Sequence, residues 1–328
     1  MKNSILVCGG AGYIGSHCVK MLLEKNYDVI VVDNLSTGHL EAVTKGAKFY
    51  QGDVRDEEFL NEVFSQNKID AVVHFCAKSL VGESMEKPLE YFDNNVNGTL
   101  VLLQAMAKAN VKKIVFSSSA AVYGEHLVMP IDETYATIPT NPYGETKLTM
   151  EKIMKWADTA FGLKYISLRY FNVAGASLSG EIGEDHNPES HLIPIVLQAA
   201  LGKRPFISVY GTDYETKDGT CIRDYIHVVD LINAHILSLE HLLKGNDSNI
   251  FNLGSEDGYS VYEIIETVKK VTGIDFKVKI GERRQGDPAK LIASSKKINE
   301  VLGWKAELGI EEIIRSAYEF HKSHPNGY

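Results

Sequence analysis

A tyrosine and a lysine stand four residues apart in the stretch NPYGETK, residues 141–147. Side chains at positions i and i+4 of a helix are neighbours, so the spacing predicts that Tyr143 and Lys147 share one helix face. A tyrosine ordinarily titrates near pH ~10, so a phenolate base at neutral pH needs positive charge close by. The same pattern also fits the first turn of an ordinary surface helix. Taken alone, it favours that simpler interpretation.

Hydroxyl groups that could orient a substrate oxygen occur in FSSSAAVYG, at the end of an apolar run. Its three serines, 117–119, would lie at the carboxyl edge of a parallel sheet if that run is a strand. A hydroxyl there could hold the oxygen that gains or loses a proton. Together with Tyr143 and Lys147, these serines make acid/base chemistry a specific hypothesis.

A glycine pattern near the start of the chain indicates where a dinucleotide would bind. VCGGAGYIGSH places Gly9, Gly12 and Gly15 directly after the first apolar run and before a helical segment. Glycines at these positions allow a tight turn and a close approach of the backbone to a pyrophosphate, which a helix N-terminus stabilises. A glycine pattern alone is weak, because other tight turns also use glycine. Here the strand and helix that the motif requires are both expected.

An acidic residue in the expected place extends this interpretation. Asp33 ends the second apolar run, eighteen residues beyond Gly15, where a carboxylate can accept hydrogen bonds from the adenosine ribose. A 2′-phosphate would be repelled, so NAD is favoured over NADP. The alternative is a helix cap at DNLSTG. Asp53, which closes the third run in QGDV, could contact the adenine.

These residues need a sheet that brings strand ends together, and the chain predicts one. The runs are apolar throughout, which is typical of strands buried on both faces of a parallel sheet with helices on each side. We therefore expect an α/β fold with a doubly wound, Rossmann-like parallel sheet. The expected strands are 4–9, 28–33, 47–53, 70–75, 112–119 and 164–172.

Two domains are expected from the length of 328 residues and from a change in rhythm near residue 175. Residues 1–175 would form the NAD-binding domain, and 176–328 a smaller α/β domain for the substrate. A segment at about 222–254 could return to the first domain. The second domain is expected to contain a helix within 191–203 closed by Gly202, a strand at 250–254, a helix at 261–273 and a strand at 276–280.

Composition excludes several classes of function. The net charge of −9 and the lack of a basic run argue against nucleic-acid binding. No apolar run reaches the ~18 residues of a membrane helix, and the early glycines do not fit a signal peptide, so a cytoplasmic location is expected. Cys8, Cys18 and Cys76 lie in apolar segments and are expected to be buried thiols. No metal site is expected, because a zinc site would need clustered ligands and none is expected in this chain.

With these residues in this order, the sequence resembles the extended short-chain dehydrogenase/reductase superfamily and, within it, the UDP-glucose 4-epimerase (UDP-galactose 4-epimerase) family. The resemblance extends over nearly the whole chain. Its motifs are GGAGYIGSH, VVDNLS, GDVRD, HFCAKSLVGESMEKPLEYFDNNVNGT, FSSSAAVYG, PYGETK, RYFNVAGA, GTDYETKDGTCIRDYIHVVDL, RRQGDPA and the terminal HPNGY.

The resemblance implies a reversible 4-epimerisation of UDP-galactose and UDP-glucose in galactose metabolism. A tightly bound NAD would take a hydride from sugar C4 and return it to the other face of a 4-keto intermediate. Ser119 would bind the 4-hydroxyl and Tyr143 would be the acid/base. Lys147 would bind the nicotinamide ribose and lower the tyrosine pKa.

The resemblance also implies two sets of binding residues. For the cofactor they are Gly9, Gly12, Tyr13, Ile14, Gly15, Asp33, Asn34, Asp53, Val54, Phe75, Ala77, Lys78, Asn95, Ser117, Tyr143, Lys147 and Phe171. For the UDP-hexose substrate they are Lys78, Ser119, Tyr143, Asn172, Leu192, Tyr210, Arg223, Tyr225, Arg284 and Asp287. Arginine forks suit a diphosphate, which favours Arg223 and Arg284 as its ligands.

Two positions depart from the family pattern. His191 stands where some relatives have asparagine, which leaves its contact with substrate open. Lys290 falls near the position whose size decides whether N-acetylated sugars enter, and a flexible lysine does not decide this. The family is typically homodimeric, and the matching helices would be about 88–109 and 143–160.

Three other functions share parts of this pattern. A 4,6-dehydratase needs acidic residues after the strand-end hydroxyl, where this chain has Ala120 and Ala121. A UDP-glucuronate epimerase would share most motifs and differ in the pocket. A non-catalytic NAD sensor would keep the glycine loop but typically lose Tyr143 and Lys147.

Overall fold

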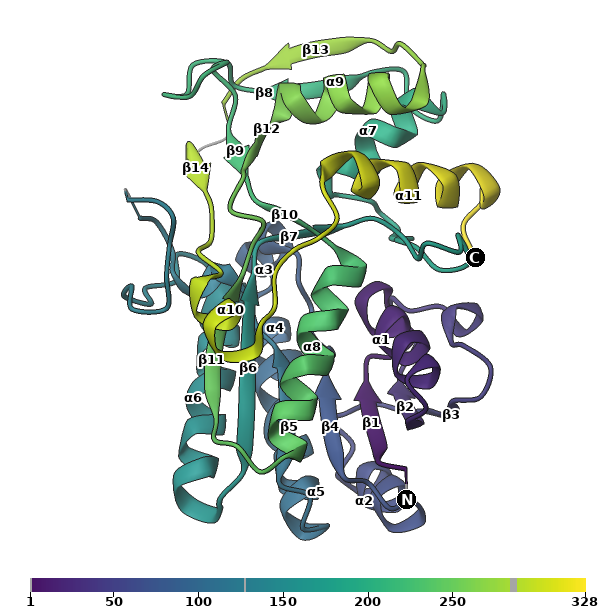
Figure 1. Cartoon of the computed structure of the whole chain (residues 1–328), viewed down its shortest axis with the longest axis vertical. Helices are drawn as coiled ribbons and strands as arrows, with labels where there is room; N and C mark the ends of the chain where they lie inside the picture. Colours follow the sequence, from purple (N-terminus) through teal and green to yellow (C-terminus); the bar gives the residue numbers. More distant parts are fainter. Residues whose placement is uncertain (1, 127, 284–287) are drawn as a thin grey trace.

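The computed structural model describes residues 2–126, 128–283 and 288–328. Its centre is a seven-stranded sheet in the order β11-β6-β5-β4-β1-β2-β3, and every pairing in it is parallel (Figure 1). The predicted doubly wound fold is confirmed. The strands are β1 Ser4–Cys8, β2 Asp28–Asp33, β3 Lys48–Gln51, β4 Ala71–His74, β5 Lys113–Ser117, β6 Lys164–Tyr170 and β11 Asn249–Leu253.

Helices cover both faces of this sheet, and the strands supply side chains to each face in turn. Ile5 and Val7 of β1 belong to one core, and Leu6 and Cys8 belong to the other. This alternation is the period of two expected of a strand buried on both faces. The first core includes α1 Tyr13–Glu24 and α8 Val228–Leu243; the second includes α2 Glu57–Gln66, α5 Gly98–Lys108 and α6 Pro142–Phe161.

The order of the strands reverses between β1 and β4, which are neighbours although two strands separate them in sequence. Such a switch point opens a crevice at the carboxyl ends of the strands, where open α/β sheets bind ligands. Gly9 follows β1 here, and the amide of Phe75, just after β4, donates to the carbonyl of Cys8. The glycine loop therefore lies where the fold itself provides a ligand site.

A smaller group of elements caps this edge, at the top of Figure 1. It has its own core, which includes Ile193, Val196, Ile264 and Ile313. Its elements are α7 Leu192–Ala200, β8 Ile207–Tyr210, β9 Ile222–Arg223, β12 Tyr259–Ser260, α9 Val261–Thr272, β13 Val278–Gly281, β14 Lys290–Leu291 and α11 Ile310–Ser323.

The chain crosses between the two groups more than once. After β9 it forms β10 Tyr225–His227, which pairs with β7 Asn172–Ala174, and then α8 and β11, which belong to the large sheet. Helix α10 Lys296–Leu302 lies against β11. The exact domain limits stay a prediction. Among the described residues, no helix is long and apolar enough to cross a membrane.

Expected strands and helices are present, with ends one to three residues shorter in most cases. The remaining short elements are η1 Leu40–Ala42, α3 Val81–Glu86, α4 Pro88–Tyr91, a π-helical segment Phe92–Asn97 and η3 Ala120–Val122. Cys8 and Cys18 are buried as expected, whereas Cys76 is only partly buried because it lies in the loop after β4.

Candidate active site

The glycine loop is packed so closely that side chains are excluded. A Cβ at Gly15 would lie 2.0 Å from the carbonyl oxygen of Gly9, and one at Gly9 would lie 2.9 Å from the amide nitrogen of Cys76. Gly9 also has a φ of +83°, which glycine adopts without strain. Gly12 stands just before α1, so the first amides of that helix point into the crevice. The loop thus fits a pyrophosphate at a helix N-terminus.

Asp33 holds this loop in place. One carboxylate oxygen accepts the amide of Ala11 at 2.9 Å, and the other accepts the amide of Leu35 at 2.8 Å. The side chain is buried at the end of β2. A carboxylate oxygen has more than one lone pair, so the group can still accept from a ribose hydroxyl while it fixes the loop.

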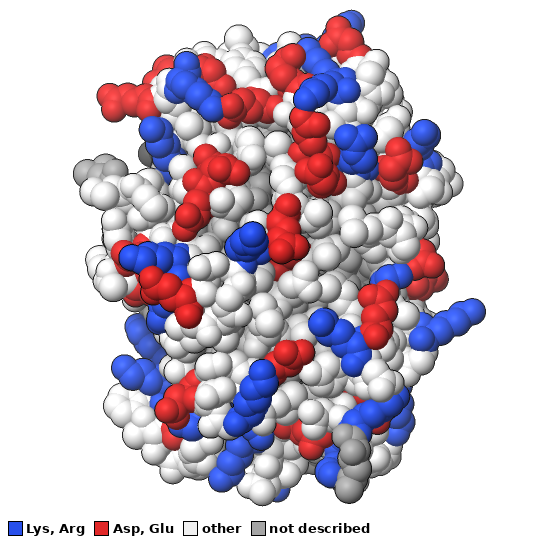
Figure 2. Space-filling view, in the orientation of Figure 1, with Lys and Arg blue, Asp and Glu red and all other residues white. Residues whose placement is uncertain are grey.

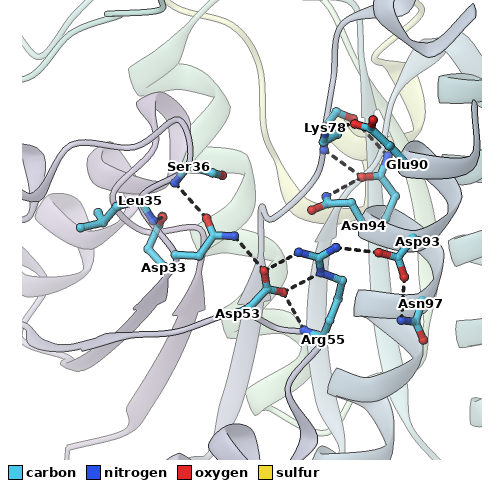
Figure 3. Close-up of polar contacts among 12 residues, drawn as sticks. Asp33, Leu35, Ser36, Asp53, Arg55, Lys78, Glu90, Asp93, Asn94 and Asn97 are labelled. Atoms are coloured by element: carbon cyan, nitrogen blue, oxygen red, sulfur yellow. Dashed lines mark hydrogen bonds and ion pairs between the residues drawn. The ribbon is translucent and has the colours of Figure 1, made fainter. Parts of the chain in front are cut away.

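Next to Asp33, a charged network lines the region where the adenosine would lie (Figure 3). Asn34 donates to Asp53 at 3.0 Å, and the guanidinium of Arg55 grips Asp53 with contacts of 2.9 and 2.8 Å. Arg55 also pairs with Asp93 at 2.6 Å. These contacts hold the pKa of the Asp53 carboxyl well below its usual range, mainly through the Arg55 hydrogen bonds.

Sequence reasoning missed Arg55 and Asp93. The signal was present, because Arg55 follows Asp53 by two residues in GDVRD. Its partner Asp93 comes from a segment 38 residues further on, so only the fold shows the pair. Val54, between Asp53 and Arg55 in the sequence, is buried.

The loop after β4 is fixed by Asn95, a fully buried residue of the π-helical segment. Its side chain bonds both the amide and the carbonyl of Lys78, at 2.8 and 3.0 Å, and donates to Thr146 of α6 at 3.0 Å. The ammonium of Lys78 lies 2.8 Å from Glu90 (Figure 3). Asn95 therefore connects the cofactor loop to the helix that carries Tyr143 and Lys147.

The start of helix α6 is determined by two residues, an N-cap asparagine and a proline in the first turn. The side chain of Asn141 accepts the amide of Gly144 at 2.9 Å, and Pro142 occupies the first turn. A Cβ at Gly144 would lie 2.4 Å from the carbonyl oxygen of Ala121. The start of the helix is thus pressed against the turn after β5, which brings Tyr143 beside Ser119.

Lys147 points inward rather than to solvent. Its ammonium donates to the carbonyl of Ser117 at 2.7 Å and lies 5.9 Å from the ring centre of Tyr143. It also sits over the ring of Phe116 at 4.9 Å. Burial lowers the pKa of Lys147 to about 7, although electrostatic interactions with Cys76 and Glu151 act in the opposite direction. The surface-helix interpretation of this pair is excluded for Lys147.

Tyr143 and Ser119 are in contact. Burial raises the pKa of the Tyr143 phenol, and a hydrogen bond with Ser119 opposes this rise. The Ser119 hydroxyl is itself oriented, since it accepts the amide of Ala121 at 3.1 Å. Without cofactor, Lys147 does not bring the tyrosine pKa below its ordinary value. A lowered pKa therefore requires the additional positive charge of a bound nicotinamide.

A buried ion pair stabilises the carboxyl end of β5. Arg169 of β6 binds Glu151 of α6 through two hydrogen bonds, of 2.9 and 2.5 Å. Ser118 donates to the same carboxylate at 2.6 Å. Arg169 also donates to Tyr123 at 2.9 Å. Sequence analysis missed this network, which fixes α6 relative to β5 and β6.

Several other predicted cofactor residues make contacts within the fold. The hydroxyl of Tyr13 donates to the carbonyl of Gly175 at 2.7 Å, and Ser117 bonds the hydroxyl of Tyr170. Phe75 packs against His235 at 4.9 Å between ring centres. Ile14, Ala77 and Phe171 are partly buried. Ile14 packs against the core that includes α1 and α8, and Phe171 packs against a cluster that includes Tyr123.

Several predicted substrate residues lie in the capping elements and in the paired strands β7 and β10. Asn172 pairs in register with Tyr225 across β7 and β10, and its side chain donates to the carbonyl of Asp224 at 3.0 Å. Leu192 begins α7, Tyr210 ends β8 and Arg223 ends β9. Lys290, in β14, pairs with Ile222 beside Arg223. Arg284 and Asp287 lie outside the described residues.

One group of potential metal ligands was not anticipated. Glu184, His186, Glu189 and His191 lie together just before α7, with all four donor atoms within 4.8 Å of one another. Sequence analysis considered cysteine clusters and noted His191 only for its place before Leu192. The spacing E-x-H-x-x-E-x-H was readable in the sequence.

Charge on the surface does not by itself identify a site for an anionic ligand. Over the face in Figure 2, basic and acidic side chains of the described residues are interspersed. With a net charge of −9, a diphosphate must therefore be held by individual donors such as helix amides and placed arginines.

Comparisons with known proteins agree with this geometry. Residues 5–254 match the model of the NAD dependent epimerase/dehydratase family. The chain belongs to that family. It is 58% identical to a UDP-glucose 4-epimerase of Lacticaseibacillus casei, over 99% of this chain and 98% of the relative.

Solved structures give the same result. A crystal structure of a UDP-glucose 4-epimerase has a TM-score of 0.98 and 56% identity, with 99% of each chain covered. The Bifidobacterium longum UDP-glucose 4-epimerase, solved with NAD⁺ and UDP, has a TM-score of 0.94 and 44% identity, with 99% and 100% covered. The family and fold expectations from sequence are confirmed.

Proposed function

We propose that this protein interconverts UDP-galactose and UDP-glucose by inverting the configuration at C4, with an NAD that stays bound. The observation that carries the proposal is the buried ammonium of Lys147, which donates to the carbonyl of Ser117 at 2.7 Å and lies 5.9 Å from the ring centre of Tyr143, at the switch point that the glycine loop occupies. The same chain is 58% identical to a relative named for this reaction.

NAD fits the described residues. Gly9, Gly12 and Gly15 leave no side chains above the amides of α1, and Asp33 presents a carboxylate where a 2′-phosphate would be repelled. The network of Asn34, Asp53 and Arg55 would border the adenosine. When bound, NAD would supply a hydride acceptor and donor for sugar C4.

Tyr143 would move the proton. Its phenolate form would take the proton of the sugar 4-hydroxyl as the 4-keto sugar forms, and the phenol would return a proton when C4 is reduced again. Ser119, oriented by the amide of Ala121, would hold the same oxygen within reach. Lys147 would stabilise the phenolate with its positive charge, and the burial of that ammonium would strengthen the interaction.

The same groups must serve both epimers, so the sugar must present either face of C4 to the cofactor while the nucleotide stays anchored. Arg223 and Arg284 would grip the diphosphate, and Asp287 would accept from the uridine ribose. Asn172, Leu192, Tyr210 and Tyr225 would complete the substrate site, with Lys78 near the sugar and cofactor. Rotation about the diphosphate would then exchange the faces.

Dehydration is a poorer fit. Ala120 and Ala121 follow Ser119 in the turn, and neither can protonate a departing 6-oxygen. N-acetylated sugars remain a second substrate class for the same reaction, since Lys290 is an exposed side chain in β14. One solved relative is named a UDP-Glc/GlcNAc 4-epimerase, from Campylobacter jejuni.

We further propose a homodimer that acts in the cytoplasm in galactose metabolism. The helices expected at the interface, 88–109 and 143–160, correspond to α4, the π-helical segment, α5 and α6. They expose large apolar side chains, which include Leu89, Leu100 and Trp156. The buried thiols Cys8 and Cys18 fit a reducing compartment.

The experiment that tests the reaction uses no added cofactor. Purified protein is incubated with UDP-galactose, and in parallel with UDP-N-acetylgalactosamine, and the nucleotide sugars are separated by chromatography. We expect UDP-glucose from the wild type and a loss of roughly a thousandfold in kcat for Tyr143→Phe. If no sugar is converted even with NAD supplied, the epimerase proposal fails for these substrates.

A further inference from the structure

The cluster of Glu184, His186, Glu189 and His191 has no part in the chemistry proposed above. It lies at the end of the loop 175–191, between the glycine-loop helix α1 and the start of α7. The ring of His186 packs edge-on against Tyr13, with ring centres 6.3 Å apart. His191 is the residue immediately before α7. The cluster therefore connects the cofactor-binding and capping parts of the molecule.

The separations within the cluster match those of ligands around one metal ion. Nδ1 of His191 lies 2.8 Å from Oε1 of Glu184. Nδ1 of His186 lies 3.2 Å from Glu184 and 3.7 Å from Glu189. Bonds of about 2.0–2.1 Å in a tetrahedral zinc site place neighbouring donor atoms roughly 3.3 Å apart. The three observed distances between the proposed donor atoms, 2.8, 3.2 and 3.7 Å, bracket that value.

Two of these donor atoms are buried without a hydrogen bond, although opposite charges are near. They are Nδ1 of His186 and Oε2 of Glu189, and they have no hydrogen-bonding partner in the described structure. Glu189 is only 8% exposed, and an unpartnered carboxylate oxygen at such a site is costly. A cation at the centre of the cluster would satisfy both atoms at once.

The surroundings of Glu189 leave that one oxygen available. Its Oε1 accepts the backbone amides of Ser190 at 2.7 Å and His191 at 2.8 Å. Such hydrogen bonds are typical of the groups that orient metal ligands from outside. Two carboxylates and two neutral imidazoles would also balance the charge of a divalent ion.

We propose that Glu184, His186, Glu189 and His191 bind a structural zinc-class divalent cation. Nitrogen and carboxylate donors in a set of four suit Zn²⁺. The ion would clip the loop against Tyr13 on one side and fix the first residue before α7 on the other. It would stabilise the junction between the two parts of the molecule without contacting the reacting sugar.

The test measures metal directly and does not depend on activity. The full chain, with its cofactor retained, is treated with a chelator, given ZnCl₂ in slight excess and passed through a desalting column. Elemental mass spectrometry should then find about one zinc per chain. X-ray absorption of that sample should show nitrogen and oxygen neighbours and no sulfur, which separates this site from zinc held by cysteines.

Variants assign the ion to the cluster. Glu189→Gln and His186→Asn should each lower zinc affinity by roughly a hundredfold and abolish the rise in Tm that zinc gives the wild type. His126→Asn, which changes a histidine in another loop, should keep both properties. If the cluster variants fail to fold, the absorption spectrum of the wild type still shows whether zinc is bound through nitrogen and oxygen or through sulfur.

Three results would overturn the proposal: a wild type that keeps no zinc, zinc bound through sulfur, or cluster variants that bind as well as the wild type. In the first case the cluster would consist of two histidine–glutamate ion pairs, and both histidines would be protonated. None of these results bears on epimerisation, so the two proposals fail independently.

Discussion

The ammonium of Lys147 donates to the backbone carbonyl of Ser117 at 2.7 Å, so the lysine is anchored to the end of the strand that also leads to Ser119. This places a buried cation one helical turn from Tyr143. The cation has little solvent to stabilise it, and burial accordingly lowers the Lys147 pKa to about 7. Burial of the Lys147 ammonium therefore lowers the stability of the folded chain, and it provides a positive charge close to Tyr143.

This cost predicts a pH dependence of stability for the cofactor-free chain. The ordinary pKa of lysine, 10.5, applies in the unfolded chain, so between pH 7 and 10.5 the unfolded state binds more protons than the folded state. The contribution of Lys147 to the free energy of unfolding therefore rises with pH through that range, by about 1.4 kcal/mol per pH unit at most. Urea unfolding at pH 7, 8 and 9 measures it.

Lys147→Met removes the titrating group, so its free energy of unfolding should rise less steeply with pH than that of the wild type. Lys296→Met is the control, because that lysine is 79% exposed in its side chain and should leave the wild-type dependence intact. A constant difference between wild type and Lys147→Met at all three pH values would show that Lys147 does not titrate in this window.

Ser119 controls how readily Tyr143 ionises. Its hydrogen bond lowers the phenol pKa against the effect of burial, so Ser119→Ala should shift the acid limb of the kcat profile to higher pH. We also expect kcat near neutral pH to fall by roughly a hundredfold, because the 4-hydroxyl loses its second partner. Initial rates with UDP-galactose from pH 5 to 10 measure both effects.

Ser119→Thr is the matched control, since it keeps a hydroxyl and should keep the wild-type profile better than the alanine variant does. An alanine variant with reduced kcat and an unmoved profile would mean that Ser119 positions the sugar without affecting the ionisation of Tyr143.

Gly15→Ala should prevent NAD binding. The new Cβ would lie 2.0 Å from the carbonyl oxygen of Gly9, and backbone on both sides cannot move without opening the loop. We expect the purified variant to lack NAD and to melt at a lower temperature than the wild type. Absorbance of the released cofactor and a thermal melt measure these outcomes.

Gly82→Ala is a suitable control, because its φ is not positive and a Cβ there would meet no described atom within 4 Å beyond its own stretch of helix. It should bind NAD as the wild type does. Normal NAD content in Gly15→Ala would contradict the close packing that assigns this loop to the pyrophosphate.

Local sequence patterns predicted the sheet because each strand carries its own signal. In β1, residues Ile5 to Cys8 are all apolar, and both faces of the sheet bury them. The glycine spacing and Asp33 also lie within one βαβ unit, so their roles could be read in order. Likewise, Asn141 and Pro142 indicate the start of α6.

What the sequence did not provide were contacts between distant segments. Arg55 pairs with Asp93, and Glu151 with Arg169, through a tertiary arrangement that has no local pattern. The pKa of Lys147 could not be predicted either, because it depends on burial rather than on the four-residue spacing. The cluster around Glu189 is local in the sequence, so the expectation that clustered metal ligands are absent was wrong.

The proposed homodimer makes a prediction about exposed apolar side chains on neighbouring helices. Leu89 of α4 is 83% exposed and Trp156 of α6 is 71% exposed, and these two helices are in contact. Such exposure is unfavourable unless a partner covers it. Leu89→Asp should therefore convert a dimer of twice 36.4 kDa to a monomer, as measured by light scattering after gel filtration.

Val301→Asp supplies the control, because Val301 is also exposed, at 46%, but lies on α10, which packs in the core on the other face of the sheet from α6. It should remain dimeric. Because α6 carries both Tyr143 and Lys147, loss of the partner should also lower kcat by loosening that helix, with less effect on KM. A Leu89→Asp protein that remains dimeric would place the interface elsewhere, and a wild type that is monomeric would contradict the homodimer; either result would remove the partner's support for the catalytic helix.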